Sequence, residues 1–332
     1  MPEAALGTQI GDYVLETRLG RGGMGVVYLA RDLALQRTVA LKLLARELTE
    51  DSTARSRFQR EIKAAVAIEH PHVVPVYSAG YEDGYFYLAM RYVQGHDLNR
   101  VLAEGGPLPE ERAMRLVGQV ASALYAVHQQ SLVHRDVKPE NVLLWTSDVG
   151  EEHAFLTDFG IARAVDEVFG ITNAGALGTR GYMAPELEQG TAPTAACDQY
   201  SLTVLAFELL TGELPFESDD DVRDMPKPMA LLAPTSSSEV RATIERGLAP
   251  DPEARFRSVL AFVRANASSS EAFERSREIT DSVKKGRSNS EVVASLTDHG
   301  LSEGRIAEIA DLERSQVVLL RRRAARRSIV GE

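Results

Sequence analysis

One run of eight residues limits what this chain can fold into more than any other feature: residues 134–141 read His-Arg-Asp-Val-Lys-Pro-Glu-Asn. The run places a carboxylate, an ammonium group and an amide on one short segment, and a second carboxylate follows at Asp158, in Asp-Phe-Gly. Such groups can hold the metal ions of a nucleoside triphosphate and direct a hydroxyl toward its last phosphorus. A lone His-Arg-Asp triplet could be structural scaffolding, but a run of eight is hard to obtain by chance.

Composition and charge allow this interpretation and exclude several others. At 332 residues and 44% hydrophobic content, the chain can bury a large core and divide into more than one domain. A net charge of -11 argues against bulk affinity for nucleic acid or anionic membranes. The only cysteine, Cys197, excludes an internal disulfide and fits a reducing compartment. We find no secretory signal and no apolar run near the roughly 20 residues of a membrane span, so we expect a soluble, cytoplasmic protein.

Hydrophobic periodicity predicts a β-rich part followed by a helical part. Alternating residues over 12–46 predict several strands, and 52–69 change to helical spacing. Two further strands and four helices are predicted after that: strands 73–77 and 85–90, and helices 113–128, 198–210, 239–248 and 258–266. A small β-rich lobe therefore precedes a larger helical lobe, with the joint at 91–95.

A glycine-rich segment lies between two of the predicted strands. Gly20, Gly22 and Gly25 are spaced as G-x-G-x-x-G, and glycines let a backbone approach phosphate oxygens closely. In a dinucleotide-binding fold a helix would follow these glycines. Here β-prone residues follow, which favours a hairpin, and a purely structural glycine turn stays open as the alternative.

Lys42 ends the strand-like run 39–42 and is predicted to point inward. A buried ammonium group needs a counter-charge or it loses its proton. Glu61, on the next predicted helix, is the candidate partner. The pair alone does not exclude two exposed side chains that never meet.

Together these motifs, with Ala-Pro-Glu at 184–186, resemble the eukaryotic-type (Hanks-type) serine/threonine protein kinases of bacteria in order and approximate spacing. The resemblance covers about residues 10–268. It implies an α+β, bilobal protein kinase-like fold, with a small β-rich N-lobe over 10–92 and a larger helical C-lobe over 96–268.

The resemblance also implies a role for each polar residue. Asp136 would accept or orient the proton of the substrate hydroxyl, and Lys138 would neutralise charge on the transferring phosphoryl group. Lys42, paired with Glu61, would hold the α- and β-phosphates of ATP. Asn141 and Asp158 would hold Mg²⁺. A lysine at 138 resembles serine/threonine rather than tyrosine specificity.

By the same resemblance, apolar residues from both lobes would enclose the adenine. Val27 would lie above the ring and Leu143 below it, with Ala40 at the back and Met90 as gatekeeper. The backbone of Arg91 and of Val93 would hydrogen-bond the base.

Further along, 158–186 resembles an activation loop, in which Thr172 is the candidate phosphosite and a solvated loop threonine is the alternative. Asp198 matches the acid that anchors the catalytic loop, and Arg255 matches the arginine that pairs with Glu186. Thr203 is a departure, because the family often has glycine there.

After residue 268 the composition changes. Residues 269–289 form a predicted linker, and 290–328 form a small all-α appendage with spacing similar to a helix-turn-helix. Its last segment carries five arginines: Arg321, Arg322, Arg323, Arg326 and Arg327. DNA contact through these arginines is one hypothesis, and a docking or homodimerising helical module is the other.

The sequence thus predicts a serine/threonine protein kinase that transfers the ATP γ-phosphate to Ser and Thr hydroxyls of proteins and autophosphorylates on its activation loop. One alternative is a nucleotide-binding scaffold without turnover, against which Lys42, Asp136, Asn141 and Asp158 argue. The other is a small-molecule phosphotransferase of similar fold, which would lack Lys138 and the peptide platform at 178–186.

Overall fold

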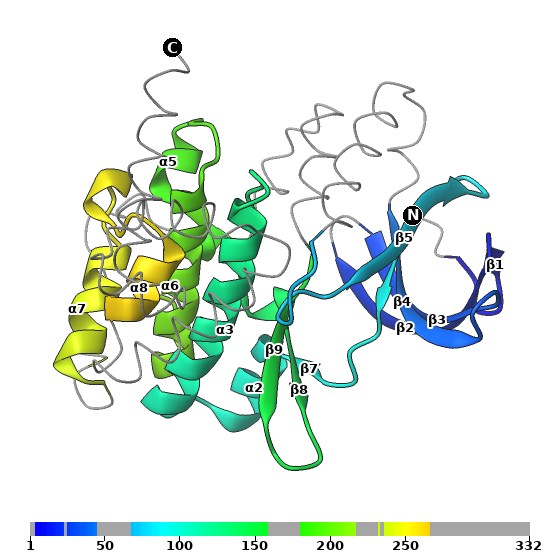
Figure 1. Ribbon diagram of the computed structural model, residues 1–332, viewed down its shortest axis with the longest axis horizontal. Helices are drawn as coiled ribbons and strands as arrows, with labels where there is room; N and C mark the ends of the chain where they lie inside the picture. The colour runs from blue at the N-terminus through cyan, green and yellow to red at the C-terminus, as the bar shows by residue number, and fades with distance from the viewer. Residues whose placement is uncertain are drawn as a thin grey trace, which may run out of the picture.

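The computed structural model describes residues 4–22, 25–44, 68–158, 180–216, 232 and 236–265 of the chain. Figure 1 shows a sheet at one end of the molecule and a group of helices at the other, with a small second sheet between them. The larger sheet is antiparallel in the order β1-β2-β3-β4-β6-β5. Its strands are β1 (Gln9–Ile10), β2 (Tyr13–Gly22), β3 (Gly25–Asp32), β4 (Arg37–Leu44), β5 (Val76–Glu82) and β6 (Tyr85–Arg91). The two-lobed α+β fold expected from the sequence is confirmed.

The register of the larger sheet decides which side chains face the helical lobe. Lys42 on β4 lies opposite Val27 on β3 and Leu88 on β6, while Ala40 lies opposite Met90. Directly opposed residues share one face of an antiparallel sheet, as do residues two apart on one strand. These five side chains therefore line a single face, and the apolar ones among them belong to or pack against the core cluster that continues into the helical lobe.

The other face of the sheet has a separate core. Residues of the opposite parity, such as Tyr28, Leu41 and Ala89, pack there with Ile10 and Leu15 from the N-terminal strands. Both faces of β4 are thus covered, which explains why its sequence reads as a nearly continuous apolar run.

The second sheet is small and lies where the two lobes meet. It consists of β7 (His96–Asp97), β8 (Val142–Thr146) and β9 (Glu152–Leu156) in that order. The expected strand over 73–77 was partly wrong, because β5 begins only at Val76. Val73 instead forms a parallel bridge with Leu156, and the Val74 N–H donates to the Leu156 carbonyl at 2.9 Å. The Leu156 N–H in turn donates to the His72 carbonyl at 2.8 Å, so backbone groups of His72 and Val74 join the segment before β5 to β9.

The helical lobe is built around two long helices, α3 (Glu110–His128) and α6 (Ala195–Thr211), which pack on each other. The helices expected at 113–128, 198–210, 239–248 and 258–266 are all present, with ends shifted by a few residues. The shorter helices and turns are α2 (Leu98–Gly105), η2 (Pro139–Asn141), η3 (Arg180–Tyr182), α5 (Pro185–Glu188), α7 (Ser238–Gly247), η5 (Pro252–Ala254) and α8 (Val259–Ala265). The helix expected over 52–69 lies almost entirely outside the described residues, and the C-terminal appendage lies wholly outside them.

Thr203, the departure noted in the sequence, is accommodated by a glycine on a neighbouring helix. It is fully buried on α6, and its hydroxyl donates to the Gln199 carbonyl at 2.8 Å. A Cβ added to Gly247 at the end of α7 would lie 2.4 Å from the Thr203 Oγ1 atom. The larger residue on α6 thus requires the smallest one on α7.

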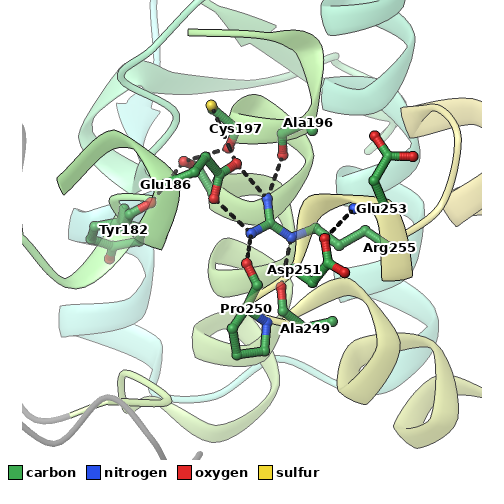
Figure 2. A network of polar contacts seen from close by, with 10 residues as sticks. Tyr182, Glu186, Ala196, Cys197, Ala249, Pro250, Asp251, Glu253 and Arg255 are labelled. Atoms are coloured by element: carbon green, nitrogen blue, oxygen red, sulfur yellow. Dashed lines mark hydrogen bonds and ion pairs between the residues drawn. The ribbon is translucent and has the colours of Figure 1, made fainter. Parts of the chain in front are cut away.

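A buried ion pair fixes the segment that precedes α6. The guanidinium of Arg255 donates to both carboxylate oxygens of Glu186 at 2.8 Å, and Figure 2 shows it enclosed by backbone carbonyls. Those carbonyls belong to Ala196, Ala249 and Pro250. All five N–H donors of the guanidinium therefore have acceptors, which removes most of the cost of burying the charge. The expected pairing of Arg255 with Glu186 is confirmed.

We expect Arg255→Lys to lower the free energy of unfolding by about 3 kcal/mol, because an ammonium group keeps the charge but cannot reach five acceptors. Arg31→Lys is the matched control, since Arg31 pairs with Glu16 at 2.8 Å on the exposed surface. Urea unfolding of both variants measures the difference. Equal stability of the two variants would contradict the importance of the buried Arg255–Glu186 ion pair.

Candidate active site

A buried carboxylate on α6 fixes the backbone at the start of the segment 134–136 by hydrogen bonds. Asp198 is fully buried and accepts hydrogen bonds from the backbone N–H groups of His134 at 2.8 Å and Arg135 at 2.7 Å. Its Oδ2 atom also lies 2.7 Å from His128 Nε2, at the end of α3. Arg135 has a left-handed backbone with φ of 69°, a conformation that persists only where surrounding bonds enforce it. Asp198 supplies that enforcement, as the sequence predicted.

The charge of Asp198 is stabilised despite its burial. Burial alone would raise the pKa of this carboxyl, but the hydrogen bond to His128 and the Arg135 N–H outweigh burial and hold the pKa below its ordinary value. The carboxylate is therefore ionised at neutral pH, as an acceptor of three hydrogen bonds should be.

His134 connects the two acidic segments of the site. Its Nδ1 atom accepts from the Asp136 N–H at 3.3 Å, so Nε2 carries the proton and donates to the Thr157 carbonyl at 2.9 Å. The ring is fully buried. One imidazole thus sets the distance between the peptide of Asp136 and the peptide that precedes Asp158.

Asp136 is held by two other residues of the run 134–141. The Asn141 amide nitrogen donates to the Asp136 carbonyl at 2.7 Å and to its Oδ2 atom at 2.8 Å. Lys138 Nζ lies 2.9 Å from the same oxygen. Among the described residues both side-chain contacts fall on Oδ2, which leaves Oδ1 as the oxygen able to accept a proton.

Lys42 pairs with Asp158 across the two lobes. Its Nζ atom lies 2.8 Å from Asp158 Oδ1, and the side chains are 11% and 27% exposed. Burial would raise the pKa of Asp158, but the ammonium of Lys42, assisted by the charge of Lys138, holds the pKa below its ordinary value. Glu61, the partner expected for Lys42, lies outside the described residues.

Few protein oxygens are available to a metal ion here. Because the Asn141 amide nitrogen faces two acceptors, its Oδ1 atom is the one left for a cation, and the ionised Asp158 carboxylate is the second oxygen donor. Within the described ranges, no group of three or more His, Cys, Asp or Glu side chains could hold a metal alone. The donor set therefore suits an ion that takes its remaining ligands from water and phosphate.

The apolar residues expected around adenine lie on both sides of the lobe joint. Val27 and Leu143 are only partly buried, whereas Ala40, Met90 and Val93 are buried. Leu143 lies on β8, opposite Asp97 and Phe155. The Arg91 N–H donates to the Pro75 carbonyl at 2.9 Å, so only the carbonyl of Arg91 could meet a base.

The three glycines of the β2–β3 hairpin differ in whether the surrounding structure leaves room for a side chain. A Cβ at Gly25, where φ is 155°, would lie 2.1 Å from the Leu43 carbonyl oxygen, so the fold itself demands glycine there. At Gly20 and Gly22 a Cβ would meet no described atom within 4 Å. Gly20 lies opposite Val27, in line with Lys42. Packing among the described residues therefore does not explain the glycine at these two positions.

Tyr182, a hydroxyl-bearing residue of the expected activation loop, is hydrogen-bonded to residues of the helical lobe. Its hydroxyl donates to the Glu208 carboxylate, and Ser201 Oγ donates to its carbonyl at 2.7 Å. Burial, reinforced by the charge of Glu208, raises the pKa of Tyr182 above its ordinary value. Burial likewise raises the pKa of Glu208. Thr172 and Thr179 lie outside the described residues.

Two residues of the site were missed in the sequence. His128 carries no motif, although a polar residue ending a buried helix six positions before His134 was a usable signal. Thr157 also belongs to no motif, yet it is buried and bonded through each of its polar groups.

The fold and the site agree with one protein family. The family model for the protein kinase domain matches residues 13–264. The chain belongs to the protein kinase family.

Relatives from Mycobacterium tuberculosis are similar along most of the chain. The serine/threonine-protein kinase PknD is 38% identical over 309 residues, which cover 90% of this chain and 45% of PknD. PknE, also a serine/threonine-protein kinase, is 40% identical over 261 residues, covering 76% of this chain and 45% of PknE. The match thus spans less than half the length of either relative.

Among solved structures, the kinase domain of Mycobacterium tuberculosis PknI is similar, with a TM-score of 0.65 and 32% identity. The similarity covers 79% of this chain and 98% of that chain. In the part of the chain that the structure describes, no helix combines the length and the apolar character needed to cross a membrane.

The anchor Asp198 leads to a prediction about acid stability. Because its pKa in the folded state lies below the unfolded value of about 3.9, its stabilising contribution is complete above that pH and is lost as the pH falls toward the folded-state pKa. We expect Asp198→Asn to lower the free energy of unfolding by about 3 kcal/mol at pH 7 and to make its acid dependence shallower. Denaturant unfolding at several pH values measures both, with the exposed Asp148→Asn as control. An acid dependence as steep as that of the parent protein would contradict the assignment.

Proposed function

We propose that this chain is an ATP-dependent serine/threonine protein kinase, which transfers the γ-phosphate of ATP to Ser and Thr hydroxyls of proteins. The observation that carries the proposal is the bonding of Asp136 to Asn141 and Lys138, next to the pair of Lys42 with Asp158. His134 and Thr157 join the two groups into one cluster. Positioning and electrostatic stabilisation are the main requirements of phosphoryl transfer.

Asp136 is the proposed base. Its Oδ1 atom takes the proton of the substrate hydroxyl while that oxygen bonds to the γ-phosphorus and the bond from phosphorus to the bridging oxygen of ADP breaks. Lys138, 2.9 Å from Asp136 Oδ2, would neutralise charge on the phosphoryl group during transfer. A lysine so close to the base also orients the carboxylate.

Lys42 and the hairpin glycines are the proposed phosphate-binding groups. In the presence of ATP, the ammonium of Lys42 would contact the α- and β-phosphates as well as Asp158. Gly20 and Gly22 would let the backbone approach the phosphates, since no packing within the described structure explains a missing side chain there. Gly25 would keep the hairpin closed against β4, because the Leu43 carbonyl oxygen occupies the place that a Cβ would need.

Adenine would lie between Val27 and Leu143, whose side chains retain exposed surface, with Ala40 and Met90 behind it. The carbonyl of Arg91 and the backbone of Val93 would bind its polar edge.

Asn141 Oδ1 and the Asp158 carboxylate are the proposed ligands of Mg²⁺. Two protein oxygens with phosphate and water as the remaining ligands match the usual coordination of this ion. When bound, the ion would neutralise charge on the phosphates. Asp158 suits this task because Lys42 already keeps it ionised.

The remaining expectations stay predictions, because they fall on residues outside the described ranges or concern the whole protein. They are a kinase domain over 10–268, a linker over 269–289, a helical module over 290–328 with DNA, docking or homodimer contacts, and autophosphorylation with Thr172 as phosphosite. The Lys42–Glu61 pair and a cytoplasmic location are also among them.

We expect Asp136→Asn to reduce phosphate transfer by about 10²- to 10⁴-fold, because the amide cannot take the hydroxyl proton. Transfer is measured with radiolabelled ATP, using the chain itself and an unstructured Ser/Thr-rich protein as acceptors. Calorimetry should show nucleotide affinity within about threefold of the parent, since Asp136 is placed at the acceptor side. The exposed Asp148→Asn is the control for charge loss.

Two results would count against the proposal. Full activity of Asp136→Asn would remove its base. Transfer to sugars or antibiotics in place of proteins would favour the small-molecule phosphotransferase instead.

A further inference from the structure

Thr157 uses all three of its polar groups, each toward a different part of the site. Its N–H donates to the Asn141 carbonyl at 3.0 Å, and its carbonyl accepts from His134 Nε2 at 2.9 Å. Its hydroxyl donates to the sulfur of Met90 at 3.7 Å. Two of these bonds reach the catalytic segment, and the third reaches β6 in the other lobe.

The next residue, Asp158, is held in an unfavourable backbone conformation. Its φ is 59°, in the left-handed region that aspartate adopts only at a cost. Such a conformation persists where neighbouring bonds enforce it, and the bonds of Thr157 lie immediately before it. The direction in which the Asp158 carboxylate leaves the chain therefore depends on the peptide that Thr157 fixes.

Consecutive side chains tie this segment to the N-terminal lobe. Thr157 contacts Met90 on β6, and Asp158 contacts Lys42 on β4. In the proposed kinase reaction the second contact must be shared with phosphates and Mg²⁺, so it no longer fixes Asp158 alone. The contact of Thr157 with Met90 involves no ligand-binding atom of Asp158 and can persist throughout.

We propose that Thr157 is a positioning residue, whose hydroxyl, bonded to the Met90 sulfur, orients Asp158 for the cation that accompanies ATP. The inference rests on the proposed function and adds a residue to it. The hydroxyl is the one of the three polar groups that belongs to the side chain, so valine can remove it and leave the backbone bonds in place. It also links the wall expected behind adenine to the carboxylate expected at the phosphates.

The test compares Thr157→Val with Thr157→Ser in the full chain. Valine keeps the branched shape and loses the donor, whereas serine keeps the donor. We expect valine to raise the Mg²⁺ concentration for half-maximal transfer about three- to tenfold, the range expected for one hydrogen bond, and serine to stay within about twofold of the parent. Thr203→Val is the matched control, because Thr203 is another buried threonine, on α6, and its hydroxyl donates to the Gln199 carbonyl of its own helix.

A second readout does not require turnover. Calorimetry with a non-hydrolysable ATP analogue should show that Mg²⁺ improves binding about three- to tenfold less in Thr157→Val than in the parent, with metal-free binding equal in both. Met90→Leu should reduce the benefit of Mg²⁺ similarly, and the double variant should be no worse than Thr157→Val alone.

The outcomes separate this inference from the proposed function. A lower melting temperature with unchanged Mg²⁺ dependence would show that Thr157 is merely structural and would overturn the inference, while the kinase assignment stands. Additive effects in the double variant would overturn the role of Met90 as acceptor. A parent protein that binds no nucleotide and transfers no phosphate would overturn both.

Discussion

The site depends first on one buried carboxylate. Asp198 has no access to solvent, and it compensates its own burial by accepting two backbone N–H groups and a histidine. Those bonds fix the peptides of His134 and Arg135, and through His134 they fix the segment that carries Asp158. A fully buried acid on α6 thus determines the positions of two other acids, Asp136 and Asp158.

The second constraint comes from the sheet, because its register decides which side chains face that acidic cluster. Lys42 lies on the same face of the sheet as Val27, Ala40 and Met90, which is the face toward Asp158. The alternate residues fill a separate core on the other face. A slip of one residue on β4 would send the ammonium into the other core. Strand β4 and the segment that carries Asp158 therefore meet at the Lys42–Asp158 ion pair, and each is fixed by its own contacts.

Much of this arrangement could be predicted from the sequence, because the motif residues are tied to particular loops and strands. The roles of Asp136, Asn141 and Asp158 in one site were expected from the resemblance of their motifs to those of protein kinases. The pairing of Val73 with Leu156 could not be predicted, since strand propensity does not specify a partner. Thr157 was missed for a similar reason. A threonine between an apolar strand and an acid is common in structural roles, and only its three hydrogen bonds distinguish it.

The contact of Thr203 with Gly247 has a consequence for how such a chain can change over time. The hydroxyl occupies the volume that any side chain at 247 would need, so Gly247 cannot gain a side chain while threonine stays at 203. A protein with glycine in place of the threonine would have room for alanine or serine on the neighbouring helix. In descendants of this sequence, a side chain at 247 is therefore expected only after a smaller residue has replaced Thr203.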